Sequence, residues 1–148
     1  MKSNIKMLYE ITRLRQSNRQ QFKRWFTSQD MDLFVWLIDD TPTHFQLSYD
    51  KRQQERMISW SYHRGFQHYL IDTGEYDSKH YKQSPLLITA CQHQNITRLA
   101  RDFLAACDNI DVGLAEFIYA RLMALPATPQ QHNVTHINHH ISNCHDLE

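Results

Sequence analysis

The sequence has few of the residues that build nucleotide sites and hydrolase sites. Its glycines are Gly65, Gly74 and Gly113, so it holds neither a glycine-rich phosphate loop nor a G-x-S-x-G turn that presents a nucleophilic serine. It also lacks a C-x-x-C pair and an H-E-x-x-H helix, the strong zinc signatures. These absences disfavour the common nucleotide-binding, serine-hydrolase and zinc-enzyme classes, and we expect no cofactor.

Long hydrophobic segments and a cysteine framework are missing as well. The longest apolar run covers residues 33–38, far fewer than the roughly 20 residues that span a bilayer, and the first ten residues hold no apolar signal core. We therefore expect no membrane association. Cys91, Cys107 and Cys144 are odd in number and widely spaced, which favours free thiols and a cytoplasmic location.

The composition is that of a folded protein. The chain has 148 residues, of which 41% are hydrophobic and 22% charged, close to the averages for globular domains. We predict a single α+β domain over residues 1–126. Residues 127–148 are rich in glutamine, asparagine and histidine and are predicted to form a flexible polar tail.

Charge is distributed unevenly although the formal net charge is zero. Up to residue 28, Glu10 is the only acidic residue, and the basic residues there are Lys2, Lys6, Arg13, Arg15, Arg19, Lys23 and Arg24. Acidic residues gather later, among them Asp102, Asp108, Asp111 and Glu116. We expect the basic segment to face an acidic region of its own fold or of a second copy, and we do not expect nucleic acid as a partner because the chain is not basic overall.

The first half of the chain is predicted to form strands. Its segments rich in aromatic and β-branched residues, separated by polar breaks, are residues 7–15, 21–28, 31–39, 43–50, 55–63 and 66–72. The first segment would also fit a helical face, but its short length favours a strand. A further short strand is predicted at residues 86–89. The result is an antiparallel meander of about six to seven strands.

Two turns fix the register of this sheet. Asp39 to Pro42 supply a hairpin turn, and Arg64-Gly65 supplies a second one. A two-residue turn at Arg64-Gly65 pairs Ser61 with His68 and Met57 with Asp72, whereas a register one residue longer would move His68 to the other face. The predicted core face carries Phe45, Leu47, Tyr49, Ile58, Trp60, Tyr62, Tyr69 and Ile71.

Two helices are predicted to follow the strands. Asn95 is the expected N-cap of the first, which has apolar residues at helical spacing: Ile96, Leu99, Ala100, Phe103, Leu104 and Cys107. Asp111 is the expected N-cap of the second, which ends at Pro126 and has the apolar residues Leu114, Ala115, Phe117, Ile118 and Leu122. Both apolar stripes are expected to pack on the aromatic face of the sheet, in an α+β architecture.

The polar face of the predicted sheet holds the candidate catalytic residues Ser61, His63 and His68. Asp72 lies four residues from His68 on one strand, about 13 Å away at 3.3 Å per residue, so it cannot complete a triad. Asp50, Lys51 and Glu55 form a second polar group. Ordinary solvated residues at a sheet surface are the favoured explanation of both groups.

The same face also holds the candidate binding residues Trp36, Gln46, Ser48, Asp50 and Lys51. Trp25, Phe34, Trp36 and Trp60 are expected to fill the core, since aromatic residues fill cores before they line sites; the second alternative is an aromatic surface on a sheet that helices cover on one side only. The second alternative predicts self-association, a protein partner or a small ligand.

The tail concentrates possible metal ligands. His132, His136 and His140 are spaced four residues apart, and Cys144 follows them, so a helical tail could present imidazoles to a transition metal. No other residues there would orient the rings. We therefore expect no functional metal site, with these four residues as the candidates should one exist.

Some of these segments resemble a known group of proteins. The motifs are RWF at residues 24–26, DLFVW at 32–36, FQLSYDK at 45–51 and GFQHYLIDTGE at 65–75. They are similar to those of a group of small uncharacterised bacterial proteins, a domain of unknown function. The resemblance covers roughly the central third of the chain. It implies a bacterial source and a fold specified by the strands, and it supplies no catalytic residue.

The sequence thus predicts a non-enzymatic module that binds a protein or a small ligand through the exposed face of its sheet. The alternative is a small hydrolase or isomerase that uses a Ser/His site on that face, and it requires these groups to converge within about 3 Å.

Overall fold

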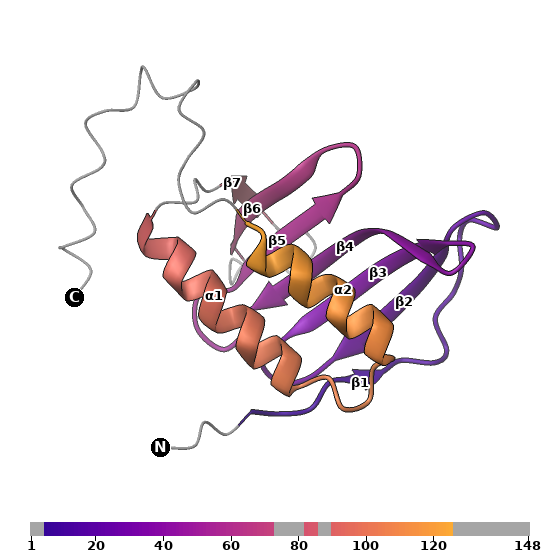
Figure 1. Cartoon of the computed structure of the whole chain (residues 1–148), viewed down its shortest axis with the longest axis horizontal. Coiled ribbons are helices and arrows are strands. Elements are labelled where there is room, and N and C mark those ends of the chain that lie inside the picture. The colour runs from indigo at the N-terminus through magenta and orange to yellow at the C-terminus, as the bar shows by residue number, and fades with distance from the viewer. Residues whose placement is uncertain (1–4, 73–81, 86–89, 126–148) are drawn as a thin grey trace.

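The computed structural model describes residues 5–72, 82–85 and 90–125 (Figure 1). The strands in these ranges are β1 (Tyr9–Glu10), β2 (Phe22–Thr27), β3 (Asp32–Ile38), β4 (Thr41–Tyr49), β5 (Arg56–Ser61), β6 (Gly65–Asp72) and β7 (Lys82–Pro85). They form one antiparallel sheet in which the spatial order equals the chain order. The predicted antiparallel meander is confirmed.

Helices α1 (Ala90–Ala105) and α2 (Val112–Met123) lie on one face of the sheet (Figure 1). The buried core between the two layers includes Phe26, Leu33, Val35, Phe45, Leu47, Ile58, Ile96, Phe103, Ile118 and Leu122. Burying each of these side chains contributes about 1.5–3 kcal/mol. The predicted α+β class and the helical stripes are confirmed, although Leu104 is exposed.

The first predicted hairpin is present. Ile38 lies opposite Thr41, so Asp39 and Asp40 form a two-residue turn between β3 and β4. Their φ angles are 49° and 63°, in the left-handed region that both central residues of a type I′ turn require. Aspartate tolerates this region better than most residues, which explains why the chain reverses here.

The predicted register of the β5–β6 hairpin is wrong. Ser61 pairs with Gly65 and Ile58 pairs with His68, so neither the Ser61–His68 pair nor the Met57–Asp72 pair exists. The connection consists of the three residues 62–64, which Gly65 follows. The φ of Gly65 is 65°, which suits the left-handed position that closes such a loop.

Moving the turn by an odd number of residues exchanges the two faces of β6. His68 therefore points into the core, where it is 3% exposed. Tyr69 pairs with Met57, which places it and Ile71 on the opposite face from the one predicted. Tyr62 lies in the turn and is exposed rather than buried.

The ends of several elements differ from the prediction. Only Tyr9 and Glu10 of the first predicted strand are in β1, and β7 occupies Lys82–Pro85, just before the short strand predicted at residues 86–89. Residues 86–89 and Pro126 lie outside the described residues. Helix α1 begins at Ala90 rather than after Asn95.

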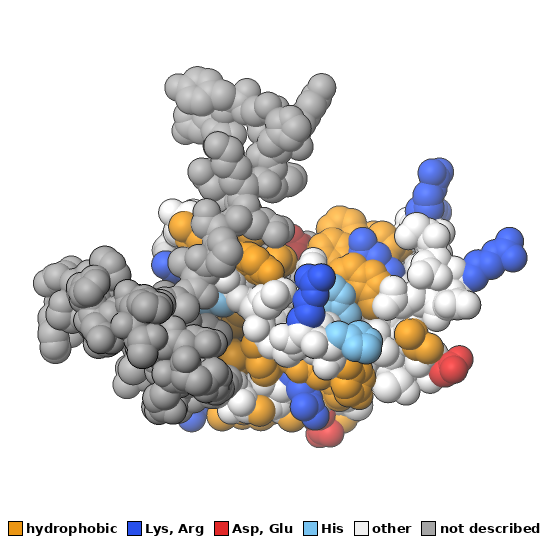
Figure 2. All heavy atoms as spheres, turned by 90° about the horizontal axis from the view of Figure 1, so that it is seen from above, with side chains coloured by type: hydrophobic (Ala, Val, Ile, Leu, Met, Phe, Trp, Pro, Cys, Tyr) orange, Lys and Arg blue, Asp and Glu red, His pale blue; other side chains and the backbone are white. Residues whose placement is uncertain are grey.

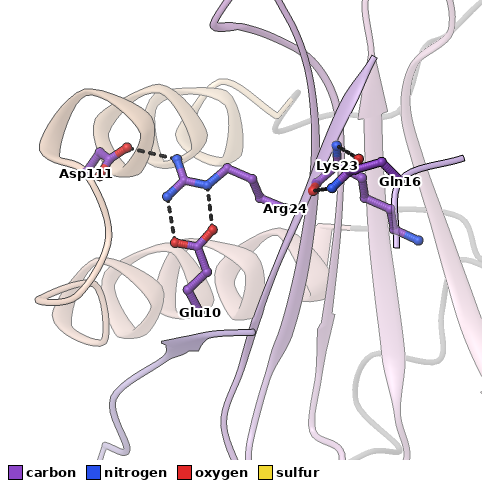
Figure 3. Close-up of polar contacts among 5 residues, drawn as sticks. All are labelled: Glu10, Gln16, Lys23, Arg24 and Asp111. Atoms are coloured by element: carbon purple, nitrogen blue, oxygen red, sulfur yellow. Dashed lines mark hydrogen bonds and ion pairs between the residues drawn. The ribbon is translucent and has the colours of Figure 1, made fainter. Parts of the chain in front are cut away.

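An ion-pair network joins the first strands to α2 (Figure 3). The Arg24 guanidinium donates two hydrogen bonds of 2.8 Å to the Glu10 carboxylate and one of 2.9 Å to Asp111. The pKa of Arg24 is raised further above its usual range, chiefly by the bonds to Glu10. Asp111 is the N-cap residue of α2 as predicted, but its side chain makes no cap hydrogen bond. For Arg24, the expectation that the basic segment faces acidic residues of its own fold is confirmed.

Candidate binding face

We call the side of the sheet turned away from α1 and α2 the outer face. The strand register places its side chains in three rows that run across the strands from β2 to β6. The first row is Lys23, Trp36, His44 and Ser61; the second is Trp25, Phe34, Gln46, Ser59 and Gln67; the third is Thr27, Asp32, Ser48, Met57 and Tyr69. Most of these side chains are half-buried, while Met57 and Ser59 are buried.

Three aromatic side chains of the outer face pack against one another. The rings of Trp25 and Phe34 are stacked with centroids 5.4 Å apart, and Phe34 and Trp36 follow at 6.2 Å. Trp25 and Phe34 therefore each have one ring face covered by the other. Trp60, by contrast, is in the core and stacks on Phe45. The sequence favoured the core for these aromatic residues. That interpretation is confirmed for Trp60 and is wrong for Trp25, Phe34 and Trp36, which lie half-buried on the outer face.

The stacked rings of the outer face extend to His44 on β4, and a lysine lies above two of them. The rings of Trp36 and His44 are stacked at 4.4 Å, and Lys23 Nζ lies 4.6 Å and 5.3 Å from the ring centroids of Phe34 and Trp36. Such a cation above aromatic rings is held by the ring quadrupole. Figure 2 shows hydrophobic side chains at the surface beside Lys, Arg and His side chains.

Acidic and basic side chains gather at the third row. The Asp32 carboxylate pairs with Lys51 Nζ at 3.0 Å and accepts hydrogen bonds from Thr27 Oγ1 and from Trp25 Nε1. Lys51 also donates to the carbonyl of Ser28 at 2.9 Å. The pKa of Glu55 is raised by burial and by Asp32. Asp32 and Glu55 thus share the charge of Lys51, which leaves this cluster with one excess negative charge when both acids are ionised.

The predicted catalytic residues do not converge. Ser61 Oγ accepts the backbone N–H of Arg64 at 3.1 Å, and His63 is exposed in the same turn. His68 lies on the opposite face, where its Nε2 is 2.7 Å from the hydroxyl of Tyr49. The proposed Ser61–His68 pair is therefore wrong, because the two side chains point to opposite sides of the sheet.

His68 is buried together with Tyr49. Its Nδ1 has no hydrogen-bond partner among the described residues, and burial, with a smaller effect of Arg56, lowers its pKa to about 4. Burial likewise raises the pKa of Tyr49. Both groups are consequently neutral at neutral pH, and they form a polar contact within the core.

Another serine and histidine do meet on the outer face. His44 Nε2 lies 3.1 Å from Ser59 Oγ, and burial lowers the pKa of His44. The register between β4 and β5 explains this contact. His44 lies opposite Ser61 and Gln46 lies opposite Ser59, so His44 and Ser59 are diagonal neighbours on the same face of the sheet. Sequence reasoning missed it because it assigned the register of β5 against β6 only.

The candidate binding residues fall into two groups. Trp36, Gln46 and Ser48 lie in the three rows of the outer face, and Lys51 reaches the third row from the turn after β4. Asp50 is exposed in that turn, has a φ of 54°, and its carboxylate is 3.8 Å from Arg56. The structure therefore brings four of the five residues to one surface.

The candidate metal ligands of the tail, His132, His136, His140 and Cys144, lie outside the described residues. Within the described ranges no cluster of three or more His, Cys, Asp or Glu side chains could hold a metal ion. In the same part of the chain, no helix has the length and apolar character needed to cross a membrane.

No family model, curated protein or solved structure matches this chain.

Proposed function

We propose that this protein is a non-enzymatic interaction module that self-associates through its outer face. One observation carries the proposal. Trp25, Phe34 and Trp36 are half-buried on the side of the sheet that α1 and α2 leave uncovered. Partly exposed aromatic residues of this kind are enriched in protein interfaces.

The arrangement of the rings favours a protein over a ligand that needs an aromatic platform. Trp25 stacks on Phe34, Trp36 stacks on His44, and Lys23 lies over the rings of Phe34 and Trp36, so these rings have fewer free faces for a nucleobase or a sugar to stack on. A second protein surface needs no free ring face, because it gains from burying ring edges and aliphatic area together.

Charge on the outer face favours a second copy as the occupant. Lys23 is in the first row and forms no ion pair with a described residue, while Asp32 of the third row and the nearby Glu55 carry one more negative charge than Lys51 balances when both are ionised. The two rows are about 13 Å apart, four residues of strand. In a dimer with the two outer faces in contact, a twofold axis perpendicular to the strands would reverse the strand direction of one copy relative to the other. The first row of each copy would then face the third row of its partner, which brings Lys23 to the acidic cluster.

The oligomeric state tests this proposal. Sedimentation velocity over a range of concentrations should show a monomer–dimer equilibrium for the wild type. Trp36→Ala should weaken its Kd by about tenfold or more. Val112→Ser, which removes an exposed apolar side chain on α2, is the matched control and should leave the Kd unchanged. A wild type that stays monomeric, or equal effects of the two substitutions, would count against the outer face.

The alternative proposal, a small hydrolase, now depends on Ser59 and His44. The motivating observation is their 3.1 Å contact, together with a lowered pKa of His44 that favours the neutral imidazole able to accept a proton. A fluorophosphonate probe would label Ser59 if it were activated, with Ser59→Ala as the control. We expect no labelling, since Ser59 is only 7% exposed.

The bacterial origin and the cytoplasmic location expected from the sequence belong to the same proposal. The described thiol of Cys107 is free and buried, which agrees with a reducing compartment.

A further inference from the structure

Strand β2 has an edge that is turned away from β3. At part of this edge a side chain, rather than a neighbouring strand, forms hydrogen bonds with the backbone. Strand β1 pairs only with Phe26 and Thr27, and Ile11 N–H donates to the carbonyl of Trp25 at 2.8 Å. Beyond them, Gln16 Nε2 donates to the Lys23 carbonyl and Gln16 Oε1 accepts the Lys23 N–H, both at 2.8 Å (Figure 3). One carboxamide thus satisfies both backbone groups that Lys23 presents at the edge.

The chemistry of this contact identifies what fits the edge. A carboxamide offers the same C=O acceptor and N–H donor as a backbone peptide group. Gln16 therefore occupies the place of one residue of an added strand, and the natural replacement for it is the backbone of an extended segment.

The Gln16 contact is exposed and held by little else. Both of its hydrogen bonds are at the surface, and no helix or strand is assigned between β1 and β2. Each such bond contributes only about 0.5–1.5 kcal/mol. An extended segment would replace both of these bonds with Lys23 and add contacts of its own with the exposed side chains around the edge.

The side chains around this edge define the charge of the partner. Arg13, Arg15 and Arg19 are exposed and form no ion pair with a described residue, and basic side chains project into solvent at the end of the molecule where Figure 1 places the segment before β2 (Figure 2). Exposed apolar side chains flank the edge at Tyr9 and Phe22. This combination fits a segment in which acidic and apolar residues alternate.

We propose that the edge of β2 binds an extended acidic segment of a partner protein, which adds to the sheet as a strand after displacing Gln16. This site is the edge of the sheet and does not depend on the outer face. Single-stranded nucleic acid would also meet the arginines, but the backbone donor and acceptor of Lys23 favour a peptide.

A fluorescent, acetylated peptide of alternating valine and glutamate is the probe, measured by anisotropy on the full chain. The wild type should bind it, and Gln16→Ala should bind about five- to tenfold more tightly because nothing has to be displaced. Lys23→Pro removes the edge N–H and should abolish binding. Lys23→Ala is its matched control, since it loses the same charge but keeps the N–H, and it should bind the peptide.

A second probe separates strand addition from attraction by charge. The same peptide with alternate backbone nitrogens methylated cannot pair at the edge and should bind at least tenfold more weakly to the wild type. This comparison holds even if Lys23→Pro fails to fold. Equal binding of the methylated peptide, tighter binding of an oligothymidine, or no gain in Gln16→Ala would each overturn the proposal. Because no step involves Trp36, the Trp36→Ala protein should bind the peptide as the wild type does, whatever becomes of its dimerisation.

Discussion

The buried His68 makes the stability of this protein depend on pH. Its pKa is lowered from 6.5 to about 4 in the folded protein, chiefly by burial, and at 3% exposure little solvent screens this effect. The difference corresponds to about 3 kcal/mol. Between about pH 6.5 and pH 4, His68 is protonated in the unfolded chain but neutral in the folded protein. The free energy of unfolding should therefore fall as the pH drops through this window and be fully restored above it.

Urea unfolding followed by circular dichroism at pH 7 and pH 4.5 measures this loss. His68→Leu removes the titration but leaves the Tyr49 hydroxyl buried without its partner, at a cost of about 1–3 kcal/mol at any pH. The double variant Tyr49→Phe, His68→Leu avoids that cost, so it is the better reference. The wild type should lose about 2–3 kcal/mol more than the double variant between the two pH values. Half-buried His44, whose pKa is also lowered, is present in both proteins and cancels. Parallel pH dependences would refute the reasoning.

Other consequences can be tested in the same way. Arg24→Met should lower the free energy of unfolding by about 2 kcal/mol, between the values for surface and buried ion pairs. A double-mutant cycle with Glu10→Gln measures how much of this loss belongs to the Arg24–Glu10 pair. Additive losses in the two single variants would show that the pair contributes nothing. Asp40→Gly should raise the stability by about 0.5–1 kcal/mol, because glycine adopts the φ of 63° without strain, whereas Gly65→Ala should lower it by about 1 kcal/mol, both seen in urea midpoints. Burial raises the pKa of Cys107 to about 12, so iodoacetamide should alkylate it far more slowly in the native protein than in urea, as peptide mass spectrometry can show; equal rates would mean that the thiol is accessible.

Local patterns were enough to predict most of the architecture. The alternation of apolar and polar residues along β4 fixes its faces, because a strand places successive side chains on opposite sides. The two aspartates of the β3–β4 turn and the apolar spacing in α1 and α2 act within a few residues. These features depend on near neighbours in the chain, and they are the ones that the sequence predicted correctly.

The arrangement of the candidate site depends on features that no local pattern encodes. A two-residue and a three-residue turn near Gly65 are both compatible with the sequence, yet they place His68 on opposite faces. Arg24 meets Asp111, 87 residues further along the chain, only because the fold brings distant segments together, and no residue pattern predicts that Gln16 reaches the backbone of Lys23. An odd shift in the β5–β6 register was sufficient to remove the expected Ser61–His68 pair, whereas the Ser59–His44 contact depends on the separate register between β4 and β5.

The meander has a consequence for the order in which the protein assembles on the ribosome. Each strand pairs with the one before it in the chain, so the sheet can grow as residues emerge, with only short loops to close. Its apolar inner face has no cover until α1 and α2 are synthesised, and residues of both helices complete the core. A nascent chain that stalls before residue 90 would display Phe45, Leu47 and Ile58 to solvent, and it is this intermediate, rather than the finished fold, that would need protection by a chaperone.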